Sequence, residues 1–525
     1  MKRYDLVIIG GGHNGLVTAA YVARAGWSVL VLERRDVLGG ACVTEELWPG
    51  FRVSTAAYVN SLFRPTIIRD LELKKHGFRM LARNPSSFTP FPDGRYLLMG
   101  PDEQLNRHEI SKFSPRDAET FPRYEQMLRR VAEIIEPTLD EAPPNPWGGW
   151  RDWIRLGKLA WRIRRLGREA ATAIEILTGA ARPILDRWFE SEELKVTLAT
   201  DAIIGAFASP STPGTAYVLF HHVMGECDGA RGVWGYVEGG MGALSQAIAS
   251  AAQSFGAEIR TEAPVRRIIT RRGEATGVVL DDGTEIGARR VASSVDCYVT
   301  FFKLLDPREL PDDYVRELRR IDYSSASLKI NCAISELPDF RCLPGKTVGP
   351  QHRGTIHICP SFDTMERAFL DAQQGCPSAQ PILEVTIPTS VDPTLAPPGH
   401  HLLSMFVQYA PYHLRGTTWD EQREAFADRC CDLLNEYAPN FKQSILHRQV
   451  LAPPDIERIF GLTGGNIFQG AMPLSNLFFM RPVAGWAQYR TPIKGLYLCG
   501  SASHPGGGVM GACGRNAARV ILRDG

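Results

Sequence analysis

The stretch Leu6-Val-Ile-Ile-Gly-Gly-Gly-His-Asn-Gly15 decides the fold. Its four apolar residues predict a buried parallel strand, and the glycines predict a tight turn into a helix over 16–25. This helix ends at Gly26, and residues 27–32 predict a second buried strand that is closed by Glu33. A strand, a glycine turn, a helix and a strand within about 30 residues form the context in which Gly-x-Gly-x-x-Gly binds a dinucleotide.

Each glycine of this turn has a separate task. Gly10 makes the tight turn, Gly12 lets the backbone approach a pyrophosphate, and Gly15 lets the helix pack closely on the strand. The helix N-terminus adds unpaired amides and the positive end of a dipole. Glu33 follows Gly10 by 23 residues, where its carboxylate can accept both ribose hydroxyls. An acid at this position disfavours the 2′-phosphate of NADP.

The residues that follow Glu33 distinguish NAD from FAD. The sequence Arg34-Arg-Asp-Val-Leu-Gly-Gly-Ala41 places Gly39 and Gly40 side by side. This Glu-x5-Gly-Gly pattern resembles an extension found in large flavoprotein families. In those families the paired glycines let the backbone run beside the pyrophosphate and the ribityl chain. The pattern therefore favours FAD.

Two distant segments agree with a flavin site. Residues 256–294 predict strands with a hairpin turn at Asp282-Gly283, and this block resembles the flavoprotein segment in which a valine, here Val265, backs the adenine. Near the C-terminus, 495–499 predicts a strand, 500–508 interrupts it, and 509–522 predicts a helix. Bare amides before that helix, together with its dipole, would stabilise negative charge on a reduced flavin ring.

A family resemblance follows from three further blocks. They are Gly464-Gly-Asn-Ile-Phe-Gln-Gly-Ala-Met-Pro473, Arg481-Pro482 and Leu496-Tyr-Leu-Cys-Gly-Ser-Ala-Ser-His-Pro-Gly-Gly-Gly-Val-Met-Gly511. From residue 4 to 522 the chain resembles the pyridine nucleotide-disulphide oxidoreductase domain-containing protein 2 group, within the phytoene desaturase-like and flavin amine oxidase FAD superfamily. The resemblance implies an α/β fold, in which a Rossmann-like FAD-binding domain is assembled from discontinuous segments and carries a mixed helix-and-sheet (α+β) substrate cap.

The motifs and this resemblance together predict the residues that bind FAD. They are Gly10, Gly12, Asn14, Gly15, Glu33, Arg34, Gly39, Gly40, Ala41, Val265, Gly500, Ser501, Gly507, Gly508, Met510 and Gly511. His504 has neighbours that would place it beside the flavin, where it could orient substrate or shuttle a proton. A purely structural role for His504 is the alternative.

Other ionisable residues give weaker signals. Glu226, Asp228, Lys329 and Arg481 could face the substrate cavity, although the sequence does not place them. The histidine pairs at 221–222 and 400–401 lack partners at metal-ligand spacing, so no metal site is expected.

The cysteines do not form a redox pair. Disulphide oxidoreductases carry Cys-x4-Cys soon after the second strand, but Cys42 is followed by Leu47 at the second position. No second strand–turn–helix unit is found for a nicotinamide cofactor, so oxygen, a quinone or another soluble acceptor is expected to take the electrons. The eleven scattered cysteines are typical of reduced thiols. Because a strand begins near Met1, no targeting segment is expected, and we predict a cytoplasmic protein with or without membrane association.

The motifs predict how the chain is divided. Residues 1–100, 235–300 and 460–525 are expected to form the FAD-binding domain. Residues 101–234 are predicted as the helical part of the cap, and 301–459 as its sheet-containing part. Within that part we expect strands over 327–332, 355–359, 382–387 and 401–407, and a helix over 419–437.

Charge and hydropathy limit the partners. The 59 Lys+Arg and 58 Asp+Glu leave a net charge of +1, so no global field would recruit nucleic acid. The apolar runs fall far short of the roughly 20 residues that cross a bilayer. Residues 147–168 nevertheless combine four tryptophans with a basic helical face. This segment predicts either peripheral membrane contact for loading an apolar substrate or a solvated helix packed on the cap.

These observations predict an FAD-dependent oxidoreductase. The expected reaction transfers a hydride from a carbon centre to flavin N5, as in phytoene desaturase-like dehydrogenation of an apolar small molecule. A flavin-dependent amine oxidase is the first alternative. The second is an FAD-bearing interaction or regulatory protein without turnover.

Overall fold

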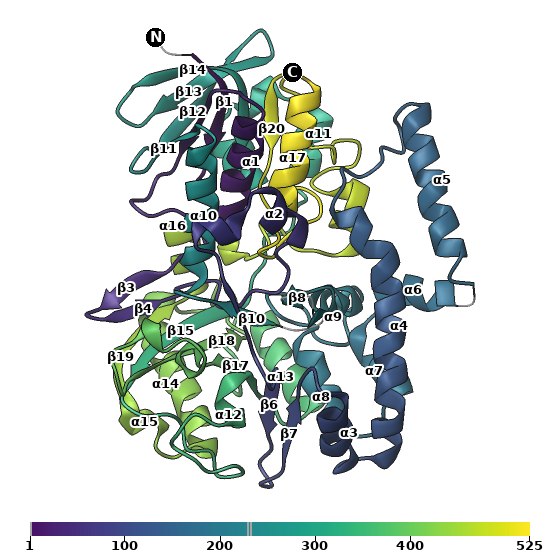
Figure 1. Ribbon diagram of the computed structural model, residues 1–525, viewed down its shortest axis with the longest axis vertical. Helices are drawn as coiled ribbons and strands as arrows, with labels where there is room; N and C mark the ends of the chain where they lie inside the picture. Colours follow the sequence, from purple (N-terminus) through teal and green to yellow (C-terminus); the bar gives the residue numbers. More distant parts are fainter. Residues whose placement is uncertain (1–2, 168, 228–229, 232–233) are drawn as a thin grey trace.

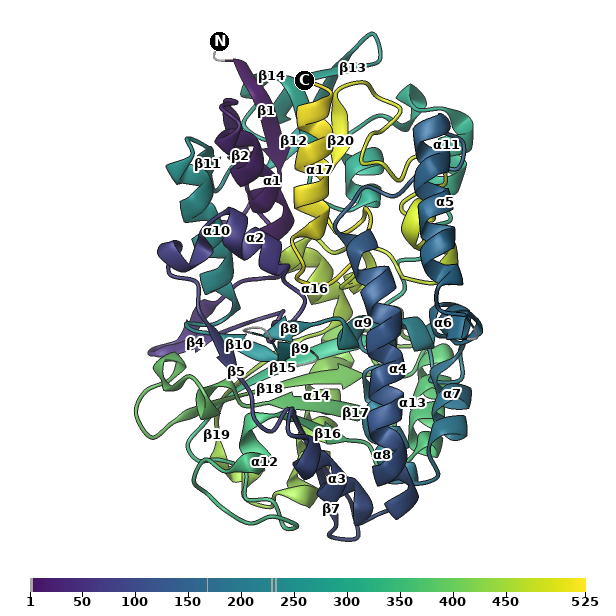
Figure 2. The same cartoon turned by 45° about the vertical axis from the view of Figure 1, so that its right-hand side comes forward.

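Two large sheets lie at opposite ends of the molecule. The computed structural model describes residues 3–167, 169–227, 230–231 and 234–525. One sheet lies near both chain ends, and the other lies at the far end (Figure 1). The helices between residues 103 and 223 run along one side (Figure 2). This mixture of helix and sheet confirms the predicted fold class.

The sheet near the chain ends contains the predicted glycine turn. Its strands run in the order β11-β2-β1-β14-β13-β12, and β20 also pairs with β14. The bounds are β1 (Arg3–Ile9), β2 (Val29–Leu32), β11 (Glu258–Arg260), β12 (Val265–Arg271), β13 (Glu274–Leu280), β14 (Glu285–Ser293) and β20 (Leu496–Leu498). β1 pairs in parallel with β2 and β14, and β20 continues the parallel part beyond β14. The predicted hairpin at Asp282-Gly283 connects the antiparallel strands β13 and β14.

Strand β1 is buried on both faces. Leu6 and Ile8 pack in one core with helices α1 (His13–Arg24), α10 (Met241–Ser254) and α17 (Ala512–Arg523). Val7 and Ile9 pack in a second core with strands β12–β14 and helix α11 (Asp312–Leu318). Because successive side chains of a strand alternate in direction, a strand covered on both faces needs a continuous apolar run. This requirement explains Leu6-Val-Ile-Ile9.

The second sheet has the order β19-β15-β18-β17-β16-β6-β7. Its strands are β6 (Ser87–Pro90), β7 (Tyr96–Met99), β15 (Ser327–Ile334), β16 (Thr355–Ile358), β17 (Ile382–Thr386), β18 (His401–Gln408) and β19 (Ile445–Leu451), and its helices are α12 (Pro350–Arg353), α13 (Phe362–Gln373), α14 (Trp419–Tyr437) and α15 (Phe441–Ser444). The four predicted strands and the predicted helix over 419–437 are confirmed.

Two predicted domain boundaries need correction. Residues 87–99 were assigned to the FAD-binding domain, but β6 pairs in parallel with β16 of the second sheet. Residues 301–318 were assigned to the cap, but Phe301, Tyr314 and Leu318 are buried in the core beneath the first sheet. In both places tertiary pairing, which has no local sequence signal, decides the assignment.

The helical part packs around one core. Its helices are α3 (Glu103–Ser111), α4 (Pro115–Leu139), α5 (Trp150–Arg164), α6 (Glu169–Thr178), α7 (Ala181–Trp188), α8 (Glu192–Thr200) and α9 (Thr215–Val223). Tyr124, Leu185 and Phe220 are fully buried there together with residues of α13. Short connecting elements complete the chain: α2 (Pro65–Asp70), α16 (Pro453–Phe460), β3 (Glu45–Trp48), β4 (Phe51–Val53), β5 (Met80–Ala82), β8 (Glu226–Cys227), β9 (Ala230–Arg231) and β10 (Gly235–Val237).

The two ends of the chain meet where α1 and α17 touch. A Cβ on Gly514 would lie 2.2 Å from the carbonyl oxygen of Asn14. The Thr18 hydroxyl donates a 3.0 Å hydrogen bond to the Gly514 carbonyl. Gly514 therefore has a packing reason to lie within α17, although glycine is unfavourable inside a helix.

This contact gives a stability prediction. Gly514→Ala should destabilise the fold by roughly 1–3 kcal/mol, because the new methyl group forces α1 and α17 apart. The melting temperature, measured by circular dichroism, should fall by several degrees. Gly157→Ala is the matched control, since nothing lies within 4 Å of a Cβ at Gly157 on α5 and alanine favours a helix. Equal melting temperatures for the two variants would contradict the close packing.

Candidate active site

The turn between β1 and α1 requires glycine at positions 10 and 15. Gly10 has φ +94°, in the left-handed region, and a Cβ on Gly15 would lie 2.3 Å from the Gly10 carbonyl oxygen. By contrast, a Cβ on Gly12 would have nothing nearer than 3.9 Å. Gly12 therefore exposes bare backbone to open space, where a ligand can approach closely.

Glu33 is fixed at the end of β2. Its Oε2 accepts a 2.8 Å hydrogen bond from the Gly11 amide, and its Oε1 accepts one of 2.9 Å from the Arg35 amide. These two hydrogen bonds fix the carboxyl group beside the glycine turn. The side chain of Arg34 points to the end of α16, where its guanidinium donates to the carbonyls of Arg458 and Ile459.

The C-terminal motif reaches the same turn. Asn14 Nδ2 donates a 3.1 Å hydrogen bond to Ser501 Oγ, although these residues are 487 positions apart. The buried guanidinium of Arg481 donates to the carbonyls of Ser501 at 2.8 Å, Phe468 at 2.7 Å and Gly470 at 3.2 Å. Arg481 thus braces two loops from within, and it does not line the cavity.

A cavity of about 1300 Å³ joins this turn to the second sheet. Pockets for one small molecule measure roughly 300–1,000 Å³, so this volume has room for a cofactor and a substrate. Eleven predicted residues line it: Gly10, Gly12, Asn14, Glu33, Arg34, Gly39, Gly40, Ala41, Val265, Ser501 and Gly508. Their role in binding stays a prediction, but the structure brings them together.

The other predicted binding residues lie behind the cavity wall. They are Gly15, Gly500, Gly507, Met510 and Gly511. A Cβ on Gly500 would lie 2.2 Å from the Ser294 carbonyl oxygen, and one on Gly507 would lie 2.4 Å from the Phe468 ring. These glycines allow loops to pack closely, and they support the cavity from behind.

His504 does not line the cavity. It is buried, and its Nε2 donates a 2.9 Å hydrogen bond to the Thr138 carbonyl at the end of α4. Its own carbonyl accepts the Tyr489 hydroxyl at 2.7 Å. Burial lowers the pKa of His504 to about 4. These contacts favour the structural alternative for His504, and its catalytic role stays a prediction.

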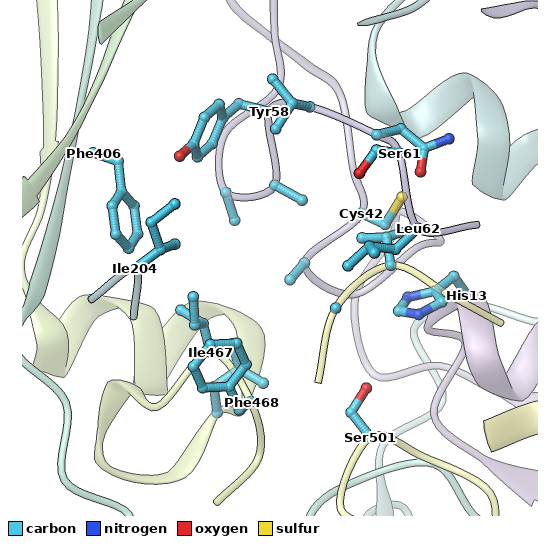
Figure 3. Close-up of a pocket in the computed structure, with 18 of the residues that line it drawn as sticks. His13, Cys42, Tyr58, Ser61, Leu62, Ile204, Phe406, Ile467, Phe468 and Ser501 are labelled. Atoms are coloured by element: carbon cyan, nitrogen blue, oxygen red, sulfur yellow. The ribbon is translucent and has the colours of Figure 1, made fainter. Parts of the chain in front are cut away.

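His13, which was not predicted, takes a position in the cavity wall. Its Nε2 is buried without a hydrogen-bond partner among the described residues, and burial lowers its pKa to about 4. Figure 3 shows His13 and Ser501 at one end of the cavity, with Tyr58, Phe406 and Ile204 at the other. An unpartnered polar nitrogen beside bare glycines fits a polar ligand such as the pyrophosphate-linked FAD. The residues present therefore fit this cofactor.

The opposite half of the cavity is built from side chains. The Tyr58 and Phe406 rings lie 6.0 Å apart, and Ile467 and Phe468 face them across the space (Figure 3). Lys329 Nζ lies 3.7 Å from the Tyr58 ring centroid and has no hydrogen-bond partner among the described residues. Burial lowers the pKa of Lys329 to about 7.

More buried ionisable groups surround Lys329. The Tyr58 hydroxyl donates a 3.0 Å hydrogen bond to Glu384. Arg83 donates to the Thr355 hydroxyl at 2.8 Å. Burial raises the pKa of Asp201 to about 7, against the opposing charge of Arg83. This half of the cavity therefore combines apolar side chains with a wall of buried ionisable groups.

Part of this polar wall could be predicted from the sequence. Lys329 was a candidate, and its place in a strand between apolar residues could have indicated a side chain directed away from the sheet core. Leu328 and Ile330 indeed pack in that core, and Lys329 lies on the opposite face. Glu226 lies in β8, while Asp228 lies outside the described residues.

The thiols are not arranged for redox chemistry. All eleven cysteines are free. Burial raises the pKa of Cys42 to about 12, and its thiol donates to the Met241 carbonyl. In the described ranges no three His, Cys, Asp or Glu side chains are grouped to hold a metal ion.

Known proteins are similar to the whole chain. The family described as flavin containing amine oxidoreductase matches residues 15–522. Pyridine nucleotide-disulfide oxidoreductase domain-containing protein 2 of Rattus norvegicus is 49% identical over 544 residues, covering 99% of this chain and 94% of that protein. Phytoene desaturase (lycopene-forming) of Pseudescherichia vulneris is 24% identical, with 99% of each chain covered. Cyclohexylamine oxidase from Brevibacterium oxydans shares the fold, with a TM-score of 0.59 at 18% identity over 100% of this chain and 99% of that one.

These matches confirm the resemblance that the three sequence blocks predicted. They also agree with the geometry of the cavity, in which one half is formed by bare glycines and the fixed carboxyl group of Glu33. The chain belongs to the flavin-containing amine oxidoreductase family and is an FAD-dependent oxidoreductase.

Proposed function

We propose that the protein dehydrogenates an apolar small molecule by taking a hydride from a carbon centre. The observation that carries this proposal is the division of the cavity. One half offers glycine backbone to the cofactor, and the other offers Tyr58, Phe406 and Ile467 to a substrate. FAD, when bound, supplies the two-electron oxidant that accepts the hydride.

Gly12, Glu33 and Ser501 are the residues that we expect to hold FAD. The open space beside Gly12 admits the pyrophosphate. The Glu33 carboxylate, already held by two amides, remains at the cavity wall for the ribose hydroxyls. Ser501 is positioned by Asn14 at the end where the loops from both chain ends meet.

Lys329 is the residue that we expect to accept the proton that the substrate releases. Forming a double bond removes a hydride from one atom and a proton from its neighbour. An amine with a pKa near 7 is partly neutral at physiological pH, so Lys329 Nζ can accept this proton inside the cavity. Glu384 and Tyr58 surround it with polar groups that stabilise the resulting cation.

Amine oxidation is the second candidate, and the paired rings of Tyr58 and Phe406 favour it. The wall of this half carries the carboxyl groups of Glu384 and Asp201 as well as Arg83 and Lys329, so its charge does not exclude a protonated amine. Dehydrogenation is preferred here because Tyr58, Phe406 and Ile467 give the rest of this half an apolar surface.

The proposal predicts which compounds reduce the flavin. Under anaerobic conditions, polyenes or cyclic hydrocarbons should bleach the flavin absorbance of the purified holoenzyme, and primary amines should not. Reoxidation by dissolved oxygen or by a soluble quinone then identifies the acceptor. Bleaching by amines alone would replace dehydrogenation with amine oxidation. No bleaching by either panel would favour the regulatory alternative.

A second prediction concerns pH. The rate of flavin reduction should rise with pH through about 7, because the neutral amine of Lys329 accepts the proton only above its pKa. In Lys329→Met the rate should fall by roughly 10²–10⁴-fold, and this pH limb should disappear. Lys494→Met, which removes an exposed lysine paired with Glu274, is the control and should keep the wild-type profile. An unchanged pH profile in Lys329→Met would remove the lysine from the mechanism.

A third prediction concerns cofactor affinity. Glu33→Gln should weaken FAD binding by roughly 10- to 100-fold, because a charged acceptor for the ribose hydroxyls is lost. Titration of the apoprotein with FAD, followed by flavin fluorescence, measures the dissociation constant. Asp36→Asn removes an exposed carboxylate three positions along the chain and should bind FAD as the wild type does. Equal affinities of the two variants would argue against the ribose contact.

A further inference from the structure

Helix α5 exposes apolar side chains on the face that points away from the protein. None of its residues is fully buried. Leu156, Leu159 and Ile163 are half-buried against the body of the molecule. At 3.6 residues per turn, Trp150, Trp153, Ile154 and Trp161 fall on the opposite face.

These outward residues form what we call the tryptophan face. It consists of Trp150, Trp153, Ile154 and Trp161, which are 69%, 60%, 48% and 59% exposed. Three tryptophans in one exposed group are unusual, since exposed apolar residues of soluble proteins are normally scattered singly. Figures 1 and 2 show α5 at the edge of the molecule, beside α4.

Basic side chains border the tryptophan face. Residues 150–165 contain Arg151, Arg155, Lys158, Arg162, Arg164 and Arg165 against Asp152, so the local charge is 6 − 1 = +5. Arg155 is paired with Glu141 and Asp152 on the inner side. The remaining five cations form no ion pair with any described residue, and Arg168, part of the segment predicted from sequence, lies outside the described residues.

Two of these cations lie over the rings. The Arg151 guanidinium is 5.4 Å from the Trp150 ring centroid, and that of Arg165 is 4.7 Å from the Trp161 centroid. Such stacking holds a cation beside an amphipathic ring, with the charge free to meet an anion. Tryptophan rings bordered by arginines are the side chains that settle between the headgroups and acyl chains of a bilayer.

We propose that the tryptophan face docks on an anionic phospholipid bilayer. Its five unpaired cations complement lipid phosphates, and its rings bury apolar surface at the headgroup boundary. A second copy of the chain fits poorly, because two such helices packed face to face would bring like charges together. No helix in the described part of the chain is both long and apolar enough to cross a membrane, so the contact is interfacial.

Vesicle binding of the FAD-loaded protein tests this proposal. With equimolar phosphatidylglycerol and phosphatidylcholine vesicles, most of the protein should co-sediment and its tryptophan emission should shift to the blue. Pure phosphatidylcholine should bind at least tenfold more weakly, and high salt should release much of the bound protein. Absence of binding to the anionic vesicles would overturn the proposal.

Paired variants locate the contact. Trp150→Ser/Trp153→Ser/Trp161→Ser and Arg162→Glu/Arg165→Glu should each lower the vesicle partition coefficient at least tenfold. Their flavin content and melting temperature should stay unchanged, because the replaced side chains are exposed. Leu370→Ser/Leu446→Ser replaces exposed apolar residues elsewhere and should bind as the wild type does.

Two further outcomes would overturn the proposal. The first is undiminished vesicle binding by both α5 variants, which would place the lipid contact elsewhere. The second is a wild-type dimer, seen by light scattering, that the tryptophan variant converts to a monomer without any lipid binding. That result would make the tryptophan face an interface between copies of the chain.

Discussion

Three glycines from opposite ends of the chain, Gly10, Gly15 and Gly500, pack tightly against Ser294. The cofactor half of the cavity depends on this packing. A Cβ on Gly500 would lie 2.2 Å from the Ser294 carbonyl oxygen, and Cβ atoms on Gly15 and Gly10 would lie 3.1 and 3.5 Å from the Ser294 Cβ. The carboxyl ends of β1, β14 and β20 therefore meet where no further side chain fits. The loops leaving these strands turn bare amides toward one space, which is where parallel sheets bind ligands.

The two halves of the cavity differ in what recognises the ligand. The cofactor half presents glycine backbone, held in place by Arg481 and Asn14, together with the Glu33 carboxyl group. The substrate half presents the side chains of Tyr58, Lys329 and Phe406. A main-chain cradle needs only glycines and the correct strand ends. A side-chain wall changes with each substitution, so the fold by itself says less about the substrate than about the cofactor.

Local signals were predictable from sequence, and long-range contacts were not. The strand–turn–helix over 6–33 depends on neighbouring residues, and the structure has it as predicted. Strands β6 and β7 were missed because β6 takes its place through pairing with the distant β16. His504 was placed beside the flavin by its glycine-rich neighbours, but the Thr138 carbonyl of α4 holds it outside the cavity. The sequence shows Lys329 as a charged residue in an apolar strand. The face of the sheet on which its side chain lies follows only from the packing of Leu328 and Ile330 in the core.

A net charge of +1 excludes a strong electrostatic field around the whole protein, but it does not exclude strong fields at single helices. Charges act over about 10 Å at moderate salt, so +5 on α5 is not cancelled by acids elsewhere on the chain. The inner face of α5 already packs against the body, and the outer tryptophans leave most of their surface in water. The free energy released when apolar surface leaves water is therefore available at this face only to a contact outside the folded chain.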